Sequence, residues 1–310
     1  LSSERVPVNA EFFEQRIRQA LAVRRKYLPN ATSFRVVNAE SDFLSGLIVD
    51  KHDDVLVLQI SSLGMEKRKE TIVGVLQRIF APRAIIERSD VGSRKFEGMS
   101  ESNGVLAGEC EGPVTIDLNG LKFETNLVEG HKTGLYLDQQ VNYRAVSQFA
   151  EGAQVLDCFC FLGGFGLHAA RSGAAHVHFL DQSEEAIAAA RRNAEANGLA
   201  AQCSFEAINA FDWLKARTRS GPNEKVIPCF DLIILDPPSF TRTRASVPDA
   251  LRGYKEIHLR ALKLLRPGGI LATFCCSHHV NAGLFQDTVL SAAYDARKIL
   301  RRVAIYSQSP

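Results

Sequence analysis

The sequence predicts an α/β fold, in which a doubly wound parallel sheet over residues 129–310 follows a small α+β domain over residues 32–128. Strand-length apolar runs alternate with helical patterns from residue 154 onward, which is the doubly wound pattern. Short β-patterned runs dominate the middle of the chain, and residues 1–31 read as a helical lead-in. A chain of 310 residues with 45% hydrophobic content can form about two domains.

The first half of the chain carries clear start, stop and turn signals. A helix is expected over residues 9–27, because the pattern ends at Leu28-Pro29-Asn30. A hairpin is expected at Asn119-Gly120, where both flanking arms alternate apolar and polar residues. Further strands are expected over residues 46–49, 55–60, 84–87 and 105–107, with one helix over residues 65–80.

The second half opens with a pattern typical of nucleotide binding. A strand containing Asp157 runs into Gly163-Gly164 and a short helix, and a second strand ends on Asp181. Glycines let the backbone approach a ligand and expose amides at the start of the helix. A carboxylate at the end of the second strand can accept hydrogen bonds from both ribose hydroxyls. The glycine spacing is not Gly-x-Gly-x-x-Gly, which argues against a dinucleotide dehydrogenase.

A strand-helix-strand unit near the end brings two reactive groups to one sheet edge. Strands are expected over residues 231–235 and 270–275, with a helix over 249–266 between them. Asp236 and Cys276 follow these strands, so a carboxylate and a thiol are expected to face one pocket. Strand alternation places Cys275 on the opposite face from Cys276, as a small core residue.

Composition limits the class of protein. No apolar run approaches the ~20 residues that cross a bilayer, so no membrane association is expected. Seven cysteines without metal-type spacing indicate free thiols in a reducing compartment and no metal site, so we expect a cytoplasmic protein. The net charge of +2 does not by itself indicate nucleic-acid binding. A basic group follows the Asp236 turn and borders the proposed pocket, either as a solvated helix face or, with Phe240, as a nucleic-acid contact; its members are Arg242, Arg244, Arg252 and Lys255.

Together, the glycine turn, Asp181 and the turn Asp236-Pro237-Pro238-Ser239-Phe240 resemble a class I S-adenosylmethionine-dependent methyltransferase. The chain is further similar to the bacterial 23S rRNA cytosine-5 methyltransferase family, through residues 130–142, Gly253-Tyr254-Lys255 and Thr273-Phe274-Cys275-Cys276-Ser277. This resemblance implies S-adenosylmethionine as cofactor and large-subunit ribosomal RNA as partner. It also implies that the chain lacks most of an N-terminal PUA domain and a last strand.

The resemblance also assigns roles to residues. Its Ser-Cys-Ser motif aligns with Cys275-Cys276-Ser277, which makes Cys276 the nucleophile and Asp236 the second catalytic residue. Asn209 stands where an adenine-binding Asp is usual, and Ser239 stands where a Lys is usual; an amide can still pair with an adenine edge. The implied cofactor-binding residues are Thr133, Asp138, Asp157, Gly163, Gly164, Asp181, Asn209 and Asp236.

Cytosine carbon 5 is a weak nucleophile, which explains the need for a thiol. A thiolate that adds to carbon 6 activates carbon 5, and Asp236 would stabilise the charge at ring nitrogen 3. The base that removes the carbon 5 proton is not identified, since His278 and His279 also read as loop residues.

Two other interpretations remain open. The Asp236 turn also resembles that of enzymes that methylate amines of adenine, guanine or a protein glutamine, in which Cys276 would only pack. Alternatively, Asn209 and the missing ends fit a non-catalytic RNA-binding module. Whether the chain forms a homodimer is also left open.

Overall fold

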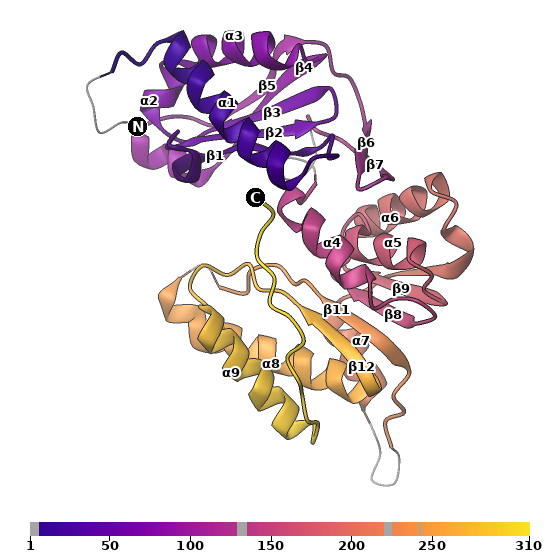
Figure 1. Cartoon of the computed structure of the whole chain (residues 1–310). Coiled ribbons are helices and arrows are strands. Elements are labelled where there is room, and N and C mark those ends of the chain that lie inside the picture. The colour runs from indigo at the N-terminus through magenta and orange to yellow at the C-terminus, as the bar shows by residue number, and fades with distance from the viewer. Residues whose placement is uncertain (1–5, 129–134, 220–224, 242) are drawn as a thin grey trace. The chain divides into compact units, whose positions relative to one another are not determined.

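The computed structural model describes residues 6–128, 135–219, 225–241 and 243–310 (Figure 1). The chain forms two compact units, of which the first comprises Leu1–Val141 with Gln308–Pro310 and the second comprises Asn142–Ser307. Among the described residues, no helix combines the length and the apolar character that crossing a bilayer requires.

The first unit is built on a five-stranded mixed sheet in the order β1-β2-β3-β4-β5, in which only β3 and β4 are parallel neighbours. A separate hairpin, β6-β7, follows it. The elements are α1 (Ala10–Tyr27), β1 (Phe34–Asn38), η1 (Ala39–Asp42), β2 (Leu47–His52), β3 (Val55–Ile60), α2 (Leu63–Glu66), α3 (Lys69–Phe80), β4 (Ala84–Ser89), η2 (Gly92–Glu97), β5 (Ser102–Gly108), β6 (Val114–Leu118), β7 (Leu121–Thr125) and η3 (Leu137–Gln139).

Helix α1 is part of the core of this unit. Asn9 caps it by accepting a hydrogen bond from the amide of Phe12 at 3.1 Å. Its buried face, including Phe13 and Ile17, packs in one cluster with residues of β1, β2, β3 and α3. The predicted helix over residues 9–27 is therefore confirmed within one residue.

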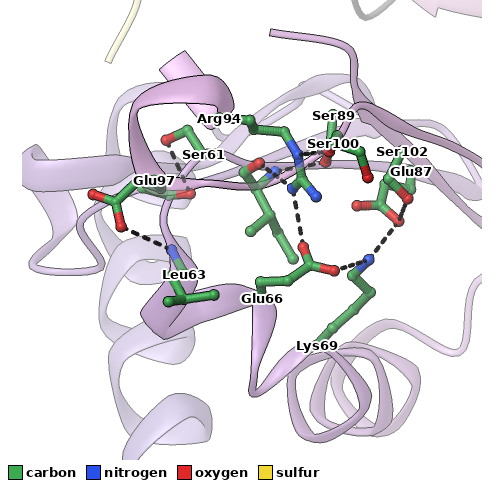
Figure 2. A network of polar contacts seen from close by, with 12 residues as sticks. Ser61, Leu63, Glu66, Lys69, Glu87, Ser89, Arg94, Glu97, Ser100 and Ser102 are labelled. Atoms are coloured by element: carbon green, nitrogen blue, oxygen red, sulfur yellow. Dashed lines mark hydrogen bonds and ion pairs between the residues drawn. The ribbon is translucent and has the colours of Figure 1, made fainter. Parts of the chain in front are cut away.

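A buried network of charges ties α2, α3, η2, β4 and β5 together (Figure 2). The ammonium of Lys69 lies 2.6 Å from Glu66 and 2.9 Å from Glu87, which is 1% exposed. The guanidinium of Arg94 donates to Glu66 at 2.9 Å, and Ser102 donates to Glu87 at 2.9 Å. Each buried charge thus has an opposite charge beside it, which is the condition for tolerating it in a core.

The second unit contains a parallel five-stranded sheet in the order β10-β9-β8-β11-β12. Helix α4 (Gln140–Ser147) precedes it and spans the boundary between the units. The elements are β8 (Gln154–Cys158), α5 (Gly164–Arg171), β9 (His176–Asp181), α6 (Glu184–Ala196), η4 (Ala200–Gln202), β10 (Cys203–Ala207), α7 (Ala210–Thr218), β11 (Phe230–Leu235), η5 (Arg244–Ser246), α8 (Val247–Leu264), β12 (Leu265–Thr273) and α9 (Ala282–Asp295).

Helices cover both faces of this sheet, so the predicted doubly wound α/β class is confirmed. On one face, Leu156 and Leu235 belong to a core cluster with residues of α7, α8 and α9. On the other face, Asp157 and Phe179 meet α5 at Gly166. The strand order reverses between β8 and β11, and ligands of open α/β sheets bind at the carboxyl ends of strands at such a point.

Three expectations about elements were wrong in detail. Strand β12 begins at Leu265, earlier than expected, because the segment through Gly268 (φ +80°) stays beside β11; it ends at Thr273 rather than residue 275. The helix expected over residues 65–80 is two helices, interrupted at Arg68. Strand β1 was not expected at all, although Val36 and Val37 are fully buried in it.

Candidate functional site

Asp157 lies at the carboxyl end of β8, buried in the sheet's switch point. One carboxylate oxygen accepts a hydrogen bond from the amide of Gly166 at 2.8 Å. The other oxygen, Oδ1, has no hydrogen-bond partner in the structure, although the residue is only 1% exposed. Burial raises the pKa of this carboxyl to about 8, against the Gly166 hydrogen bond, and the nearby charges of Asp236 and Asp181 add to the rise.

The turn after β8 requires its glycines. Gly163 is in the left-handed region (φ +87°) as the residue before α5, a conformation that other residues rarely adopt. A Cβ on Gly166 would lie 2.2 Å from the Phe179 ring. Helix α5 therefore begins close against β9, with its first amides at the sheet edge where β8 ends, one residue after Asp157.

Asp181 ends β9 and is held by two backbone amides. Its oxygens accept hydrogen bonds from Phe161 and Ser183, each at 3.0 Å. Phe161 belongs to the turn after β8, so Asp181 ties the turn to the end of the neighbouring strand. The side chain is half-buried, and each oxygen keeps a second lone pair for a further donor.

Asn209 has a structural role that its sequence position did not reveal. It is the N-cap of α7, and its side-chain oxygen accepts a hydrogen bond from the amide of Phe211 at 2.9 Å. The residue is exposed beyond the end of β10. An aspartate would cap the helix equally well, so capping does not explain the amide.

Asp236 and Cys276 follow neighbouring strands, as expected. The amide of Phe274 donates to the carbonyl of Leu235 at 2.9 Å, which joins the first residue after β12 to the last residue of β11. The sulfur of Cys276 lies 3.6 Å from the carbonyl oxygen of Pro237, the residue after Asp236, and the cysteine is exposed. The thiol and the Asp236 turn therefore share one edge of the sheet.

The two adjacent cysteines differ in environment, but not for the predicted reason. Strand β12 ends at Thr273, so strand alternation does not extend to residues 275 and 276. Cys275 is half-buried, packs against the cluster of α7, α8 and α9, and its sulfur lies 3.5 Å from the hydroxyl of Tyr254. Cys276 instead lies outside that cluster, against the Asp236 turn.

Sequence reasoning missed a set of hydroxyls behind these loops. The hydroxyl of Tyr254, on α8, lies 2.9 Å from that of Ser277, which lies 3.0 Å from that of Ser239 in the Asp236 turn. Tyr254 is fully buried and Ser277 is 5% exposed. Tyr254 lies in Gly253-Tyr254-Lys255, one of the segments that carry the family resemblance, but it also reads as an apolar-face residue of a helix. Nothing in the sequence places its hydroxyl beside those of Ser277 and Ser239.

The predicted basic group is partly paired with acids. Arg252 forms an ion pair with Asp249, and Lys255 lies 2.7 Å from Asp295. Arg244 is exposed in η5. The Phe240 ring is half-buried, with its centroid 4.5 Å from that of Tyr254.

Two of the predicted site residues, Thr133 and Arg242, lie outside the described residues. Asp138 is a residue of η3 in the first unit. Against burial, which lowers it, the pKa of Arg35 is raised by the hydrogen-bonded ion pair to Asp50 and, to the smallest extent, by the charge of Asp138.

Comparison with known proteins shows the family. Residues 88–294 match the family described as S-adenosylmethionine-dependent methyltransferase. The chain is 40% identical over 308 residues to "Ribosomal RNA large subunit methyltransferase I" of Photobacterium profundum, covering 97% of this chain and 76% of the relative. It is 42% identical over 295 residues to the protein of the same name from Shewanella denitrificans, covering 94% and 73%.

The fold agrees with this family, and so do the groups at the sheet edge. The structure of SMU.776 complexed with SAH superposes with a TM-score of 0.78 at 22% identity, covering 94% of this chain and 74% of that one. S-adenosylmethionine is the family's cofactor, and the buried, unpartnered acceptor on Asp157 and the strand-end carboxylate of Asp181 fit a cationic nucleoside. The chain belongs to the family of S-adenosylmethionine-dependent methyltransferases that includes the ribosomal RNA large subunit methyltransferase I proteins.

Proposed function

We propose that this methyltransferase acts on 23S ribosomal RNA and methylates carbon 5 of a cytosine, with Cys276 as the nucleophile. The names of its relatives support large-subunit ribosomal RNA as the substrate. The observation that carries the carbon 5 chemistry is the exposed thiol of Cys276 against the Asp236 turn, 3.6 Å from the Pro237 carbonyl oxygen. Such a substrate places the protein in the cytoplasm.

Cys276 would act by forming and then breaking one bond. Its thiolate adds to carbon 6 of the ring, and the electron pair of the carbon 5–carbon 6 double bond becomes available at carbon 5. S-adenosylmethionine supplies the electrophilic methyl group that carbon 5 takes up. A base then removes the carbon 5 proton, the double bond re-forms, and the sulfur leaves carbon 6 as a thiolate.

Asp236 is proposed to face ring nitrogen 3. Addition at carbon 6 develops negative charge at this nitrogen, and a shared proton between it and the carboxyl would stabilise that charge. The half-buried position of Asp236 immediately before Pro237 supports this role, because the same turn contacts Cys276.

The cofactor is proposed to lie over the turn at Gly163 and Gly164, with its ribose hydroxyls on Asp181. Asp157 would offer its unpartnered oxygen to the positively charged end, since a buried carboxylate gains most from a nearby cation. The remaining proposed cofactor contacts in the second unit are Asn209 and Asp236.

The RNA backbone is proposed to contact the basic group after the Asp236 turn, namely Arg242, Arg244, Arg252 and Lys255, with Phe240 nearby. The acidic partners of Arg252 and Lys255 hold these side chains at the surface of α8. Phosphates would compete with Asp249 and Asp295 for them, so Arg244 is the strongest single candidate.

The rival function, methylation of an exocyclic amine, requires no covalent adduct. An aromatic residue of the Asp236 turn would have to stack on the target base. Phe240 packs instead on Tyr254 at 4.5 Å and on Phe211 at 5.5 Å between centroids. This packing favours the cysteine chemistry.

Mass mapping of methylated nucleosides in ribosomal RNA tests the proposal. RNA from cells with and without the full-length gene would be compared, and loss of one 5-methylcytosine in 23S RNA is expected. Loss of a methylated adenine or guanine would instead support the rival function. An unchanged set of modifications in both ribosomal RNAs would contradict the proposed substrate.

A further inference from the structure

A chain of hydroxyls connects the buried side of α8 to the loop that carries Cys276. It runs from Cys275 to Tyr254 at 3.5 Å, from Tyr254 to Ser277 at 2.9 Å, and from Ser277 to Ser239 at 3.0 Å. It ends at the carbonyl oxygen of Thr241, 2.7 Å from Ser239. These residues come from α8, the loop after β12 and the Asp236 turn.

The direction of every hydrogen bond in this chain follows from its last member. A carbonyl oxygen can only accept, so the single proton of Ser239 points at Thr241. Ser239 must then accept from Ser277, and Ser277 must accept from Tyr254, because each hydroxyl has one proton. The Tyr254 oxygen is left as the acceptor for the thiol proton of Cys275.

The two adjacent cysteines donate to different acceptors. Cys275 donates its thiol proton to the Tyr254 hydroxyl, inside the chain. The Cys276 thiol donates to the carbonyl oxygen of Pro237 at 3.6 Å, in the Asp236 turn. The chain also fastens Ser277, next to Cys276, to Ser239 in the turn that begins at Asp236.

We propose that Tyr254, Ser277 and Ser239 form a one-way hydroxyl relay that positions the Cys276 loop against the Asp236 turn. Tyr254 and Ser277 are thus positioning residues for the methyl transfer. The inference rests on the proposed function, since it presumes that Cys276 is the nucleophile.

The test is the rate at which Cys276 forms an adduct with RNA that contains 5-fluorocytidine, measured together with turnover and cofactor binding. The variants are Tyr254→Phe, which keeps the ring that packs on Phe240, and Ser277→Ala, with Ser277→Thr as the conservative control. Loss of one buried hydroxyl that makes two hydrogen bonds should slow adduct formation and kcat about tenfold. KM for RNA and the affinity for S-adenosylmethionine should stay the same, and Ser277→Thr should restore the rate.

A second measurement does not depend on turnover. Iodoacetamide alkylation, followed by peptide mass spectrometry at several pH values, reports the two thiols separately. In the wild-type protein Cys276 should react well before Cys275, and Tyr254→Phe should speed the reaction of Cys275 by removing its acceptor.

The outcomes separate failure of the relay from failure of the proposed function. Adduct formation by Tyr254→Phe and Ser277→Ala at the wild-type rate, with unchanged Cys275 alkylation, would overturn the relay while leaving the nucleophile in place. If wild type forms no adduct, the proposed function fails and the relay fails with it. If Tyr254→Phe does not fold, Ser277→Ala and its threonine control decide the question.

Discussion

The sulfur of Cys276 lies 3.6 Å from the carbonyl oxygen of Pro237, so the thiol that follows β12 touches the turn that follows β11. The two strands are parallel neighbours, paired from Leu232 and Ile270 to Leu235 and Thr273. Their shared register brings both loops to one sheet edge, where a base could meet the thiol and the carboxylate together.

Asp181 provides the first prediction, which concerns the cofactor. Asp181→Ala should weaken binding of S-adenosylmethionine by roughly 1–3 kcal/mol, because the ribose hydroxyls lose their acceptor. Isothermal titration calorimetry measures this directly. Glu184→Ala, at an exposed position in the first turn of α6, is the matched control and should bind normally. Equal affinity of Asp181→Ala and wild type would remove the ribose from this position.

Asp157 should make the free energy of unfolding fall as the pH rises, because its pKa is raised in the folded protein. Its pKa is raised from 3.8 to about 8, so folding takes up a proton between these values. The contribution of Asp157 to the free energy of unfolding is complete below pH 3.8 and is lost as the pH rises toward 8. Between these values the free energy of unfolding falls by at most about 1.4 kcal/mol per pH unit.

Asp157→Asn should therefore flatten the rise in unfolding free energy on going from pH 8 to pH 5. Urea unfolding at several pH values, without cofactor, checks this. Asp212→Asn, an exposed change in the first turn of α7, should leave the slope as it is in wild type. An identical slope for Asp157→Asn and wild type would show that Asp157 is ionised throughout.

The network around Glu87 predicts a stability effect in the first unit. Lys69→Met leaves Glu87 buried beside Glu66 without its cation, and should destabilise the protein by about 3–5 kcal/mol. The double variant Lys69→Met/Glu87→Gln should recover part of the loss. Denaturant unfolding measures both, and additive losses in the double variant would show that the two residues do not interact.

The basic group near the site predicts salt-dependent RNA binding. Arg244→Ala should weaken binding of all RNA sequences alike and lower the slope of log affinity against log salt by about one. Lys255→Ala should change the slope less, because Lys255 is already paired with Asp295. Arg191→Ala, on α6, serves as the control, and a slope equal to that of wild type for Arg244→Ala would argue that this patch does not touch phosphates.

Much of the fold was predictable from local patterns. The hairpin turn at Asn119-Gly120 was predicted from two residues, and both have the positive φ values, 57° and 82°, that such a turn needs. Strand β9 ends on Asp181, as predicted, since an apolar run between turn signals leaves few alternatives. By contrast β1 was missed, because its five residues carry too little pattern to separate a strand from a loop.

The site was predictable only in its strand-end residues. Asp157, Asp181, Asp236 and Cys276 could be placed because parallel strands end at one edge. The hydroxyl relay through Tyr254 and Ser277 could not, since it depends on contacts between residues far apart in the chain. The ion pairs that occupy Arg252 and Lys255 were missed as well: one is local, but the other reaches across to α9.

Covalent trapping tests the central claim most directly. The protein would be incubated with S-adenosylmethionine and RNA that carries 5-fluorocytidine, and adducts would be mapped by peptide mass spectrometry. Fluorine at carbon 5 cannot leave as a proton does, so the bond to carbon 6 should persist. We predict an adduct on Cys276 in wild type and in Cys275→Ser, and neither adduct nor methylation with Cys276→Ala. An adduct on Cys275, or methylation retained by Cys276→Ala, would contradict the account.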